Sequence, residues 1–368
     1  MPLNPSRLVL ARRRRGLTQT KLAEAAGVSV RSVKAYEAGT KAPTKAITVK
    51  LATILGFPMG FLVADEPLEL LDLDAVSFRS LKSLTANSRD AGLAAAALAV
   101  RLSDWAQQQF ELPAVDIPDD LSGVDPETAA DALRRCWGIG EAPIVNMVHL
   151  LESKGVRVFS LAEDCRALDA FSTWRDGVPF VFLNTVKTGA KGRMDAAHEL
   201  GHIVLHREVR PNGREAEDQA TRFGAAFLMP RASLLAARLP TASLPHLMRI
   251  KADWGVALAA VVVRLHRLGR LTDWQYRALF VELSKKGYRT AEPDDVPRET
   301  SAVLQQMFTM LRGEGKSLAA LAAELDLFPD ELARMVFGLC VVGLDGDGSA
   351  KGPNPTTLRL VAGDRPPR

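Results

Sequence analysis

One short stretch constrains the fold most strongly. Residues 195–202 contain a His-Glu-x-x-His sequence, in which His198 and His202 are four residues apart. In an α-helix, residues at this spacing lie on one face, one turn apart, so both imidazoles can reach the same metal ion. Zinc accepts histidine nitrogens at about 2.0–2.1 Å, which suits this arrangement. The stretch therefore predicts a metal-binding helix, and Gly201 allows a second element to pack closely against it.

Glu199 lies between the two histidines and points to the neighbouring edge of the same helix. From there its carboxylate can take a proton from a water that the metal activates, which is the arrangement of zinc peptidases. Zinc lowers the pKa of such a water to about 7, so the chemistry suits neutral pH. Glu199 is therefore the candidate catalytic base. The alternative is a solvated helix whose histidines share a face without any function.

A catalytic zinc site usually takes a third protein ligand, commonly a Glu or a His. His206 is one further turn along the helix, so on a straight helix its ring lies about 6 Å beyond His202 and is poorly placed for the same ion. We expect instead that a second helix, over about 214–227, crosses the first and presents a carboxylate. The downstream candidates are His206, Glu208, Glu215, Glu217 and Asp218.

A different pattern occupies the N-terminal residues, where short helical segments alternate with glycines. Thr18 is placed to cap a helix over 19–26, Gly27 to form a tight turn, and Ser29 to cap a helix that runs through Ala38. This spacing predicts a helix-turn-helix. Residues 1–50 hold eleven Lys and Arg but only two Glu, whereas the rest of the chain is mildly acidic. The charge distribution favours nucleic-acid binding confined to one end.

The remaining sequence predicts a mostly α protein with a small β-sheet, the α+β class. Three short runs rich in β-branched and aromatic residues, 156–160, 170–174 and 179–183, predict strands, and the Asp176-Gly177 pair predicts a hairpin between the last two. We expect a helix-turn-helix domain over 1–65, a helical linker over 66–126, a zincin-like domain over 127–235, a helical domain over 236–344 and a disordered tail over 345–368.

The cysteines and the hydropathy pattern bear on the cellular compartment. The three cysteines, Cys136, Cys165 and Cys340, are far apart and form no CxxC motif, which favours a reducing environment. We see no signal-peptide pattern and no apolar run of the ~20 residues that span a membrane. These features predict a cytoplasmic protein that does not bind membranes.

The N-terminal pattern closely resembles the Xre/phage-repressor family over about residues 5–63. The resemblance rests on Leu17-Thr-Gln-x-x-Leu22-Ala23, Gly27-Val-Ser29 and Tyr36-Glu37-x-Gly39. It implies that the third helix, which begins after Ser29, enters the major groove of operator DNA, and that the protein binds as a homodimer. Val30, Arg31 and Lys34 would face base edges, Gln19 and Ser32 would contact or orient the DNA backbone, and the Arg12–Arg15 cluster would attract phosphates.

The central part is similar to the ImmA/IrrE metallopeptidase family. The similarity rests on residues 169–184, on Ala197-His-Glu-Leu-Gly-His202, and on the segment from Glu217 to Pro230. It implies Zn²⁺ as the cofactor and Glu217 as the third ligand, with Glu215 as the alternative. In this segment, many relatives have an acidic residue directly before the alanine and an Asn directly after it. This chain has Gln219 and Thr221 at these two positions.

Together the two resemblances imply a DNA-binding transcriptional regulator with zinc-dependent endopeptidase activity. The expected substrate is a partner repressor of the Xre type, whose cleavage relieves repression in a stress or mobile-element response. Two other hypotheses remain at this stage. The metal site could be structural or sensory in a transcription factor, or the peptidase-like body could sequester a toxin, as antitoxins do.

Overall fold

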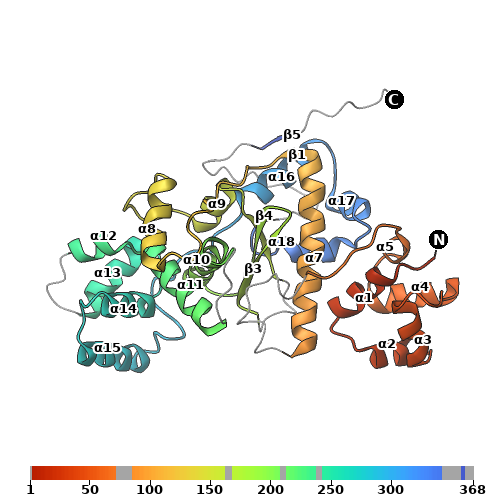
Figure 1. Cartoon of the computed structure of the whole chain (residues 1–368), viewed down its shortest axis with the longest axis horizontal. Helices are drawn as coiled ribbons and strands as arrows, with labels where there is room; N and C mark the ends of the chain where they lie inside the picture. Colours follow the sequence, from red (N-terminus) through yellow and green to blue (C-terminus); the bar gives the residue numbers. More distant parts are fainter. Residues whose placement is uncertain are drawn as a thin grey trace. The chain divides into compact units, whose positions relative to one another are not determined.

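The computed structural model describes residues 2–71, 85–161, 168–207, 213–237, 243–341 and 358–360. These residues are mostly helical and include a small sheet of three strands, which confirms the predicted α+β class (Figure 1). The helices are α1 Pro5–Arg14, α2 Gln19–Ala26, α3 Val30–Glu37, α4 Lys45–Leu55, α5 Met59–Val63, α7 Ala86–Gln109, α8 Pro126–Cys136, α9 Met147–Ser153, α10 Gly189–Leu205, α11 Gly213–Leu228, α12 Arg231–Ala236, α13 Leu244–Trp254, α14 Leu258–Arg267, α15 Asp273–Lys285, α16 Ala302–Gly313, α17 Leu318–Glu324 and α18 Pro329–Val336. The strands are β1 Phe110–Glu111, β2 Arg157–Ser160, β3 Ala170–Arg175, β4 Val178–Leu183 and β5 Arg359–Leu360.

Backbone contacts divide the chain into two compact units. The first contains residues 1–113, 159–169 and 301–368, and the second contains residues 114–158 and 170–300. The first unit includes the N-terminal helices and the C-terminal helices, and the second includes the His-Glu-x-x-His stretch. The domain boundaries expected from the sequence remain a prediction.

The five N-terminal helices of the first unit form the expected helix-turn-helix domain. The side chains of Thr18, Ser29 and Thr44 accept hydrogen bonds from the backbone at the starts of α2, α3 and α4, as N-caps do. Gly27 has a φ of 66°, a conformation that glycine adopts without strain, and it makes the turn between α2 and α3. The small core of the domain is made of fully buried residues that include Leu8, Leu22, Val33, Leu51 and Phe61.

The first unit also contains the long helix α7 and the C-terminal helices α16–α18. Trp105 on α7 contacts Phe110 edge-to-face, with ring centroids 6.2 Å apart, and its indole Nε1 donates to Glu324 at the end of α17. Phe110 begins β1, which pairs antiparallel with β5. The predicted disordered tail lies largely outside the described residues, but within it Arg359–Leu360 form this short strand.

The three-stranded sheet has the strand order β2-β4-β3, and its strands β3 and β4 belong to the second unit. β3 and β4 form the predicted hairpin, with Ala170 opposite Leu183 and Arg175 opposite Val178. Its turn residues, Asp176 and Gly177, have φ values of 50° and 76°. Two successive residues with positive φ are typical of the type I′ turn, which matches the twist of the strands.

Helices α10 and α11 pack closely against each other beside this sheet. A Cβ added to Gly201 of α10 would lie 3.1 Å from Ala220 Cα, and one added to Gly224 of α11 would lie 3.0 Å from the backbone nitrogen of His198. Each glycine therefore lets the backbone of the other helix approach, as expected for Gly201. Phe223 and Phe227 of α11 are fully buried.

Three helices, α12, α13 and α14, follow α11. Gly255, with a φ of 62°, ends α13, because its left-handed conformation cannot continue the helix.

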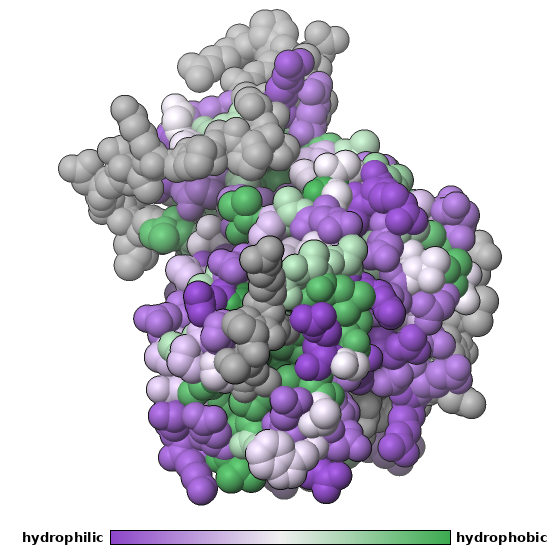
Figure 2. All heavy atoms as spheres, turned by 90° about the vertical axis from the view of Figure 1, so that its left-hand side faces the viewer, coloured by the Kyte–Doolittle hydropathy of each residue, from purple (hydrophilic) through white to green (hydrophobic). Residues whose placement is uncertain are grey.

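Figure 2 shows the side of the second unit that carries α12–α15, where hydrophobic side chains lie between many hydrophilic ones. Helix α9 begins at Met147, and the side chain of Asn146 caps it by accepting from the backbone nitrogen of His149. Among the described helices, none combines the length and the apolar character that a membrane crossing requires.

Candidate metal centre and nucleic-acid interface

The candidate metal centre is built on α10 and α11. Both predicted histidines lie on one face of α10, and their Nε2 atoms are 3.1 Å apart. The carboxylate of Glu217, from the second turn of α11, lies 3.3 Å from His198 Nε2 and 3.5 Å from His202 Nε2. These are three residues from two helices with one potential ligand atom each, all turned toward one point.

The separations can be compared with those that a zinc ion requires. Ligands at about 2.0–2.1 Å from a tetrahedral zinc are separated from one another by about 3.3–3.4 Å. The three distances observed between the ligand atoms, 3.1, 3.3 and 3.5 Å, lie around this value. The residues present therefore fit a zinc ion, which would be held by two histidines and one glutamate, a ligand set that catalytic zinc sites use.

Charge at the centre also suits a cation. Burial alone would raise the pKa of Glu217, but the hydrogen bonds and charges of His198 and His202 outweigh it and hold that pKa well below its usual range. Burial would lower the pKa of His198, but Glu217, Glu199 and Asp195 together raise it. Glu217 is therefore ionised at neutral pH, the form in which a carboxylate binds a metal.

A side chain of the sheet fixes the position of the Glu199 carboxylate. Glu199 is 3% exposed, and Ser172 of β3 donates a hydrogen bond of 2.7 Å from its Oγ to Glu199 Oε2. A carboxylate that accepts such a bond is fixed in direction, which a proton acceptor requires. Sequence reasoning did not single out Ser172, because its contact with Glu199 depends on how β3 packs on α10.

The other candidate ligands lie elsewhere. Glu215 Oε1 accepts a hydrogen bond from the amide of Gln219, at 3.4 Å, and Asp218 forms an ion pair with Arg267, at 3.6 Å. Glu208 lies outside the described residues. The structure thus brings Glu217, rather than Glu215 or Asp218, next to the two histidines.

His206 and Thr221 contact the histidines from outside. His206 Nδ1 lies 2.9 Å from His202 Nδ1, and its Nε2 lies 2.9 Å from Gln219 Oε1. Thr221 Oγ1 lies 3.3 Å from His198 Nδ1. Burial lowers the pKa of His206 to about 4, so its ring is neutral at neutral pH. His206 is therefore a neighbour of the centre, as expected from its place one turn beyond His202.

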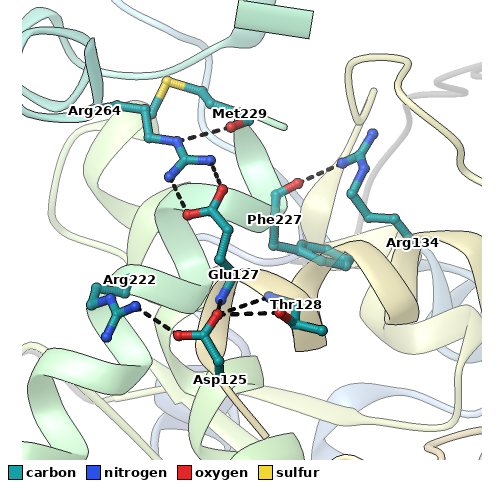
Figure 3. Close-up of polar contacts among 8 residues, drawn as sticks. All are labelled: Asp125, Glu127, Thr128, Arg134, Arg222, Phe227, Met229 and Arg264. Atoms are coloured by element: carbon teal, nitrogen blue, oxygen red, sulfur yellow. Dashed lines mark hydrogen bonds and ion pairs between the residues drawn. The ribbon is translucent and has the colours of Figure 1, made fainter. Parts of the chain in front are cut away.

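A network of ion pairs ties α11 to α8 and α14 (Figure 3). Asp125, the N-cap of α8, forms an ion pair of 2.8 Å with Arg222 on α11. Arg264, a buried residue of α14, forms two hydrogen bonds with Glu127 and donates to the carbonyl of Met229 just after α11. Arg134 of α8 donates to the carbonyl of Phe227. These contacts hold the helix that carries Glu217, and they join residues too distant in the chain for sequence reasoning to pair.

In the helix-turn-helix domain, α3 exposes the residues expected to read DNA. Arg31 and Lys34 are exposed, and Val30 is half-buried at the start of the helix. Ser29 Oγ accepts from the backbone nitrogen of Ser32 and lies 3.0 Å from its Oγ, so this pair shapes the N-terminus of α3.

The side chain of Gln19 donates to Glu37 at 2.7 Å. This bond anchors Gln19 at the start of α2, where backbone phosphate contacts are expected.

The predicted role of the Arg12–Arg15 cluster is wrong for most of its members. Arg12 pairs with Glu37, and Arg14, which is 2% exposed, pairs with Glu331 of α18. Arg15 donates to the carbonyls of Leu55 and Gly56 as well as to Glu331. These guanidinium groups satisfy partners inside the unit and are not presented to phosphates. Arg13, which forms an ion pair with Asp90, is the most exposed of the four arginines.

Two family models match the chain. Residues 151–266 match the one described as the IrrE N-terminal-like domain, a peptidase family, and residues 8–62 match a helix-turn-helix family. Residues 151–266 are thus similar to the ImmA/IrrE peptidase family, and residues 8–62 to helix-turn-helix domains of the Xre type. The peptidase-domain match includes β3, β4, α10, α11 and hence every residue of the candidate metal centre. No curated protein matches the chain.

Proposed function

We propose that this protein is a DNA-binding regulator and a zinc-dependent endopeptidase. Its substrate would be a partner repressor of the Xre type, and cleavage would relieve repression in a stress or mobile-element response. The observation that carries the proposal is the convergence of His198, His202 and Glu217 on one point, with Glu199 held beside them. Such a set has little structural use without a metal, because it brings buried polar groups together at a desolvation cost.

Each residue of the candidate site has a definite role in this proposal. His198, His202 and Glu217 hold the ion, which when bound lowers the pKa of water and polarises the scissile carbonyl. Glu199, oriented by Ser172, takes the proton from the attacking water and passes it to the leaving amine. β3 is an edge strand in the order β2-β4-β3, and an edge strand can align an extended peptide by main-chain hydrogen bonds.

The decisive variant for the peptidase is Glu199→Gln, which keeps the size of the side chain but removes its basicity. Purified protein would be incubated with Xre-type repressors from the same genome, and the products identified by mass spectrometry. We expect the variant to bind zinc and to cleave about 10²–10⁴-fold more slowly. Glu282→Gln, the same change on α15, is the matched control and should cleave normally.

The outcomes separate the competing functions. Cleavage by Glu199→Gln at the normal rate contradicts the mechanism. Zinc binding without any cleavage, together with DNA binding that depends on the metal, favours a sensory or structural metal site. Tight binding of a toxin without its cleavage favours an antitoxin-like role.

For the DNA-binding half we propose that α3 reads the operator through Arg31 and Lys34, with the protein acting as a homodimer on paired half-sites. The double variant Arg31→Ala/Lys34→Ala should weaken operator binding by more than tenfold, since each good base contact contributes about 1–3 kcal/mol. Gel-shift titration at fixed salt measures this, and Arg277→Ala/Lys285→Ala on α15 removes the same charge elsewhere. Equal losses in both double variants would contradict a specific role for α3.

A further inference from the structure

A chain of polar groups leads away from the candidate metal centre. It starts at His202 Nδ1, which lies 2.9 Å from His206 Nδ1, and continues from His206 Nε2 to Gln219 Oε1, also at 2.9 Å. The amide nitrogen of Gln219 then donates to Glu215 Oε1 at 3.4 Å. Of these four residues only His202 offers an atom to the metal centre, through its Nε2.

The direction of every hydrogen bond in this chain follows from its far end. A carboxylate at Glu215 accepts only, so Gln219 turns its NH₂ toward Glu215 and its carbonyl oxygen toward His206. That oxygen accepts only, so His206 must carry its proton on Nε2, which leaves Nδ1 as an acceptor. His202 must then donate from Nδ1, and its Nε2 is left with a lone pair directed at Glu217 and His198.

From this geometry we infer that His206, Gln219 and Glu215 form a relay that sets the tautomer and the ring orientation of His202 for zinc. The inference rests on the proposed metal site and adds three positioning residues to it. A neutral histidine binds a metal through whichever nitrogen lacks the proton, and the hydrogen bond made by the other nitrogen decides which one that is.

The end of α10 makes this relay possible. α10 ends at Leu205, and His206 is its C-cap with a φ of −117° and a ψ of 22°. Because the backbone leaves the helical conformation there, the ring of His206 contacts the ring of His202 and does not continue the helix face that carries His198 and His202. The ring centroids of His202 and His206 are 5.0 Å apart.

Two substitutions at His206 separate the relay from simple packing. In His206→Asn the side-chain oxygen takes the place of Nδ1 as acceptor, whereas His206→Leu fills the space without one. We expect His206→Leu to weaken zinc affinity by about 10–100-fold and His206→Asn to restore most of it. Competition with a chromogenic chelator measures the affinity, and His266→Leu, which removes a histidine elsewhere in the same unit, should leave it unchanged.

Histidine-selective ¹⁵N NMR gives a readout independent of activity and of metal. In the metal-free protein we expect His202 as the Nδ1–H tautomer and His206 as the Nε2–H tautomer, with His206→Asn used to assign the signals. The opposite tautomer at His206, or equal zinc affinity of His206→Leu and the unchanged protein, overturns the relay. Failure of the unchanged protein to bind zinc overturns the proposed function instead, while the tautomers still decide the relay.

Discussion

Glu217 and Asp218 are neighbours in the chain but meet different surroundings. Glu217 faces two histidines in a mostly buried position, and Asp218 faces Arg267 at the surface. A carboxylate beside two imidazoles has the chemistry of a possible metal ligand, whereas an exposed ion pair contributes little to stability. One position along α11 therefore separates the proposed zinc ligand from an ordinary surface charge.

This contrast gives a test at the residue scale. Glu217→Gln should lower zinc affinity by at least tenfold, because a neutral amide is a weaker ligand than a carboxylate and the two histidines alone hold the ion poorly. Asp218→Asn should bind zinc as the unchanged protein does. Metal content after dialysis against a chelator measures both, and equal zinc content in the two variants would exclude Glu217 as a ligand.

At the scale of elements, the metal centre depends on how closely α10 and α11 approach. Gly224 faces the backbone of Ala197 and His198, where an added Cβ would come within 3.0–3.2 Å of three backbone atoms. Backbone of a packed helix cannot move aside as a flexible side chain does. The ion pair between Arg222 and Asp125 ties α11 to α8, and Arg264 of α14 donates to the carbonyl of Met229 just after α11 (Figure 3).

We therefore expect Gly224→Ala to destabilise the protein by about 1–3 kcal/mol, as overpacking does, and to weaken zinc binding. Gly192, on the first half of α10, is the matched control, because an added Cβ there meets no atom within 4 Å. Gly192→Ala should stabilise by up to about 1 kcal/mol, since alanine is the better helix former. Thermal melting of the metal-free proteins measures both changes, and an unchanged melting temperature for Gly224→Ala would contradict the close approach.

At the scale of the whole chain, the two ends of the sequence meet within the first unit. Glu331 of α18 is 3% exposed and accepts from Arg14 at 2.6 Å and from Arg15 at 2.7 Å. This pairing joins the helix-turn-helix domain to a helix more than 300 residues later. The stability of the N-terminal domain should therefore depend on the C-terminal helices.

Glu331→Gln should lower the free energy of unfolding by about 3–5 kcal/mol, because it leaves two buried or half-buried guanidinium groups without their carboxylate. Asp330→Asn changes the exposed neighbour and should have little effect. Urea unfolding followed by circular dichroism measures the difference. Similar midpoints for the two variants would contradict a stabilising role of the ion pair.

The same ion pair predicts a pH dependence. Burial alone would raise the pKa of Glu331, but Arg14 and Arg15 outweigh it and lower that pKa. A carboxylate whose pKa is lower in the folded state stabilises the fold above its ordinary pKa and loses this contribution as the pH falls toward the folded value. The stability difference between the unchanged protein and Glu331→Gln should thus be full at neutral pH and shrink in acid. A difference that grows as the pH falls would contradict the assignment.

Sequence by itself determined what depends on neighbours along the chain. The four-residue spacing of His198 and His202 places them on one face of α10. The hydroxyl side chains of Thr18 and Ser29 cap the helices that follow them, and Asp176-Gly177 forms the turn of the β3–β4 hairpin. Each of these needs only helical periodicity or a local backbone preference. Spacing alone left several carboxylates as candidates for the third metal ligand, and the family resemblance pointed to Glu217.

Tertiary structure decided what depends on which elements meet. Only the crossing of α10 and α11 brings Glu217, and not Glu215, to the histidines and joins His206 to Gln219. Only the contact of α1 with α18 turns Arg14 from an apparent phosphate binder into a buried ion-pair partner. The physical reason is that the sequence gives the charge of each side chain, whereas its partner depends on packing between segments that are far apart in the sequence.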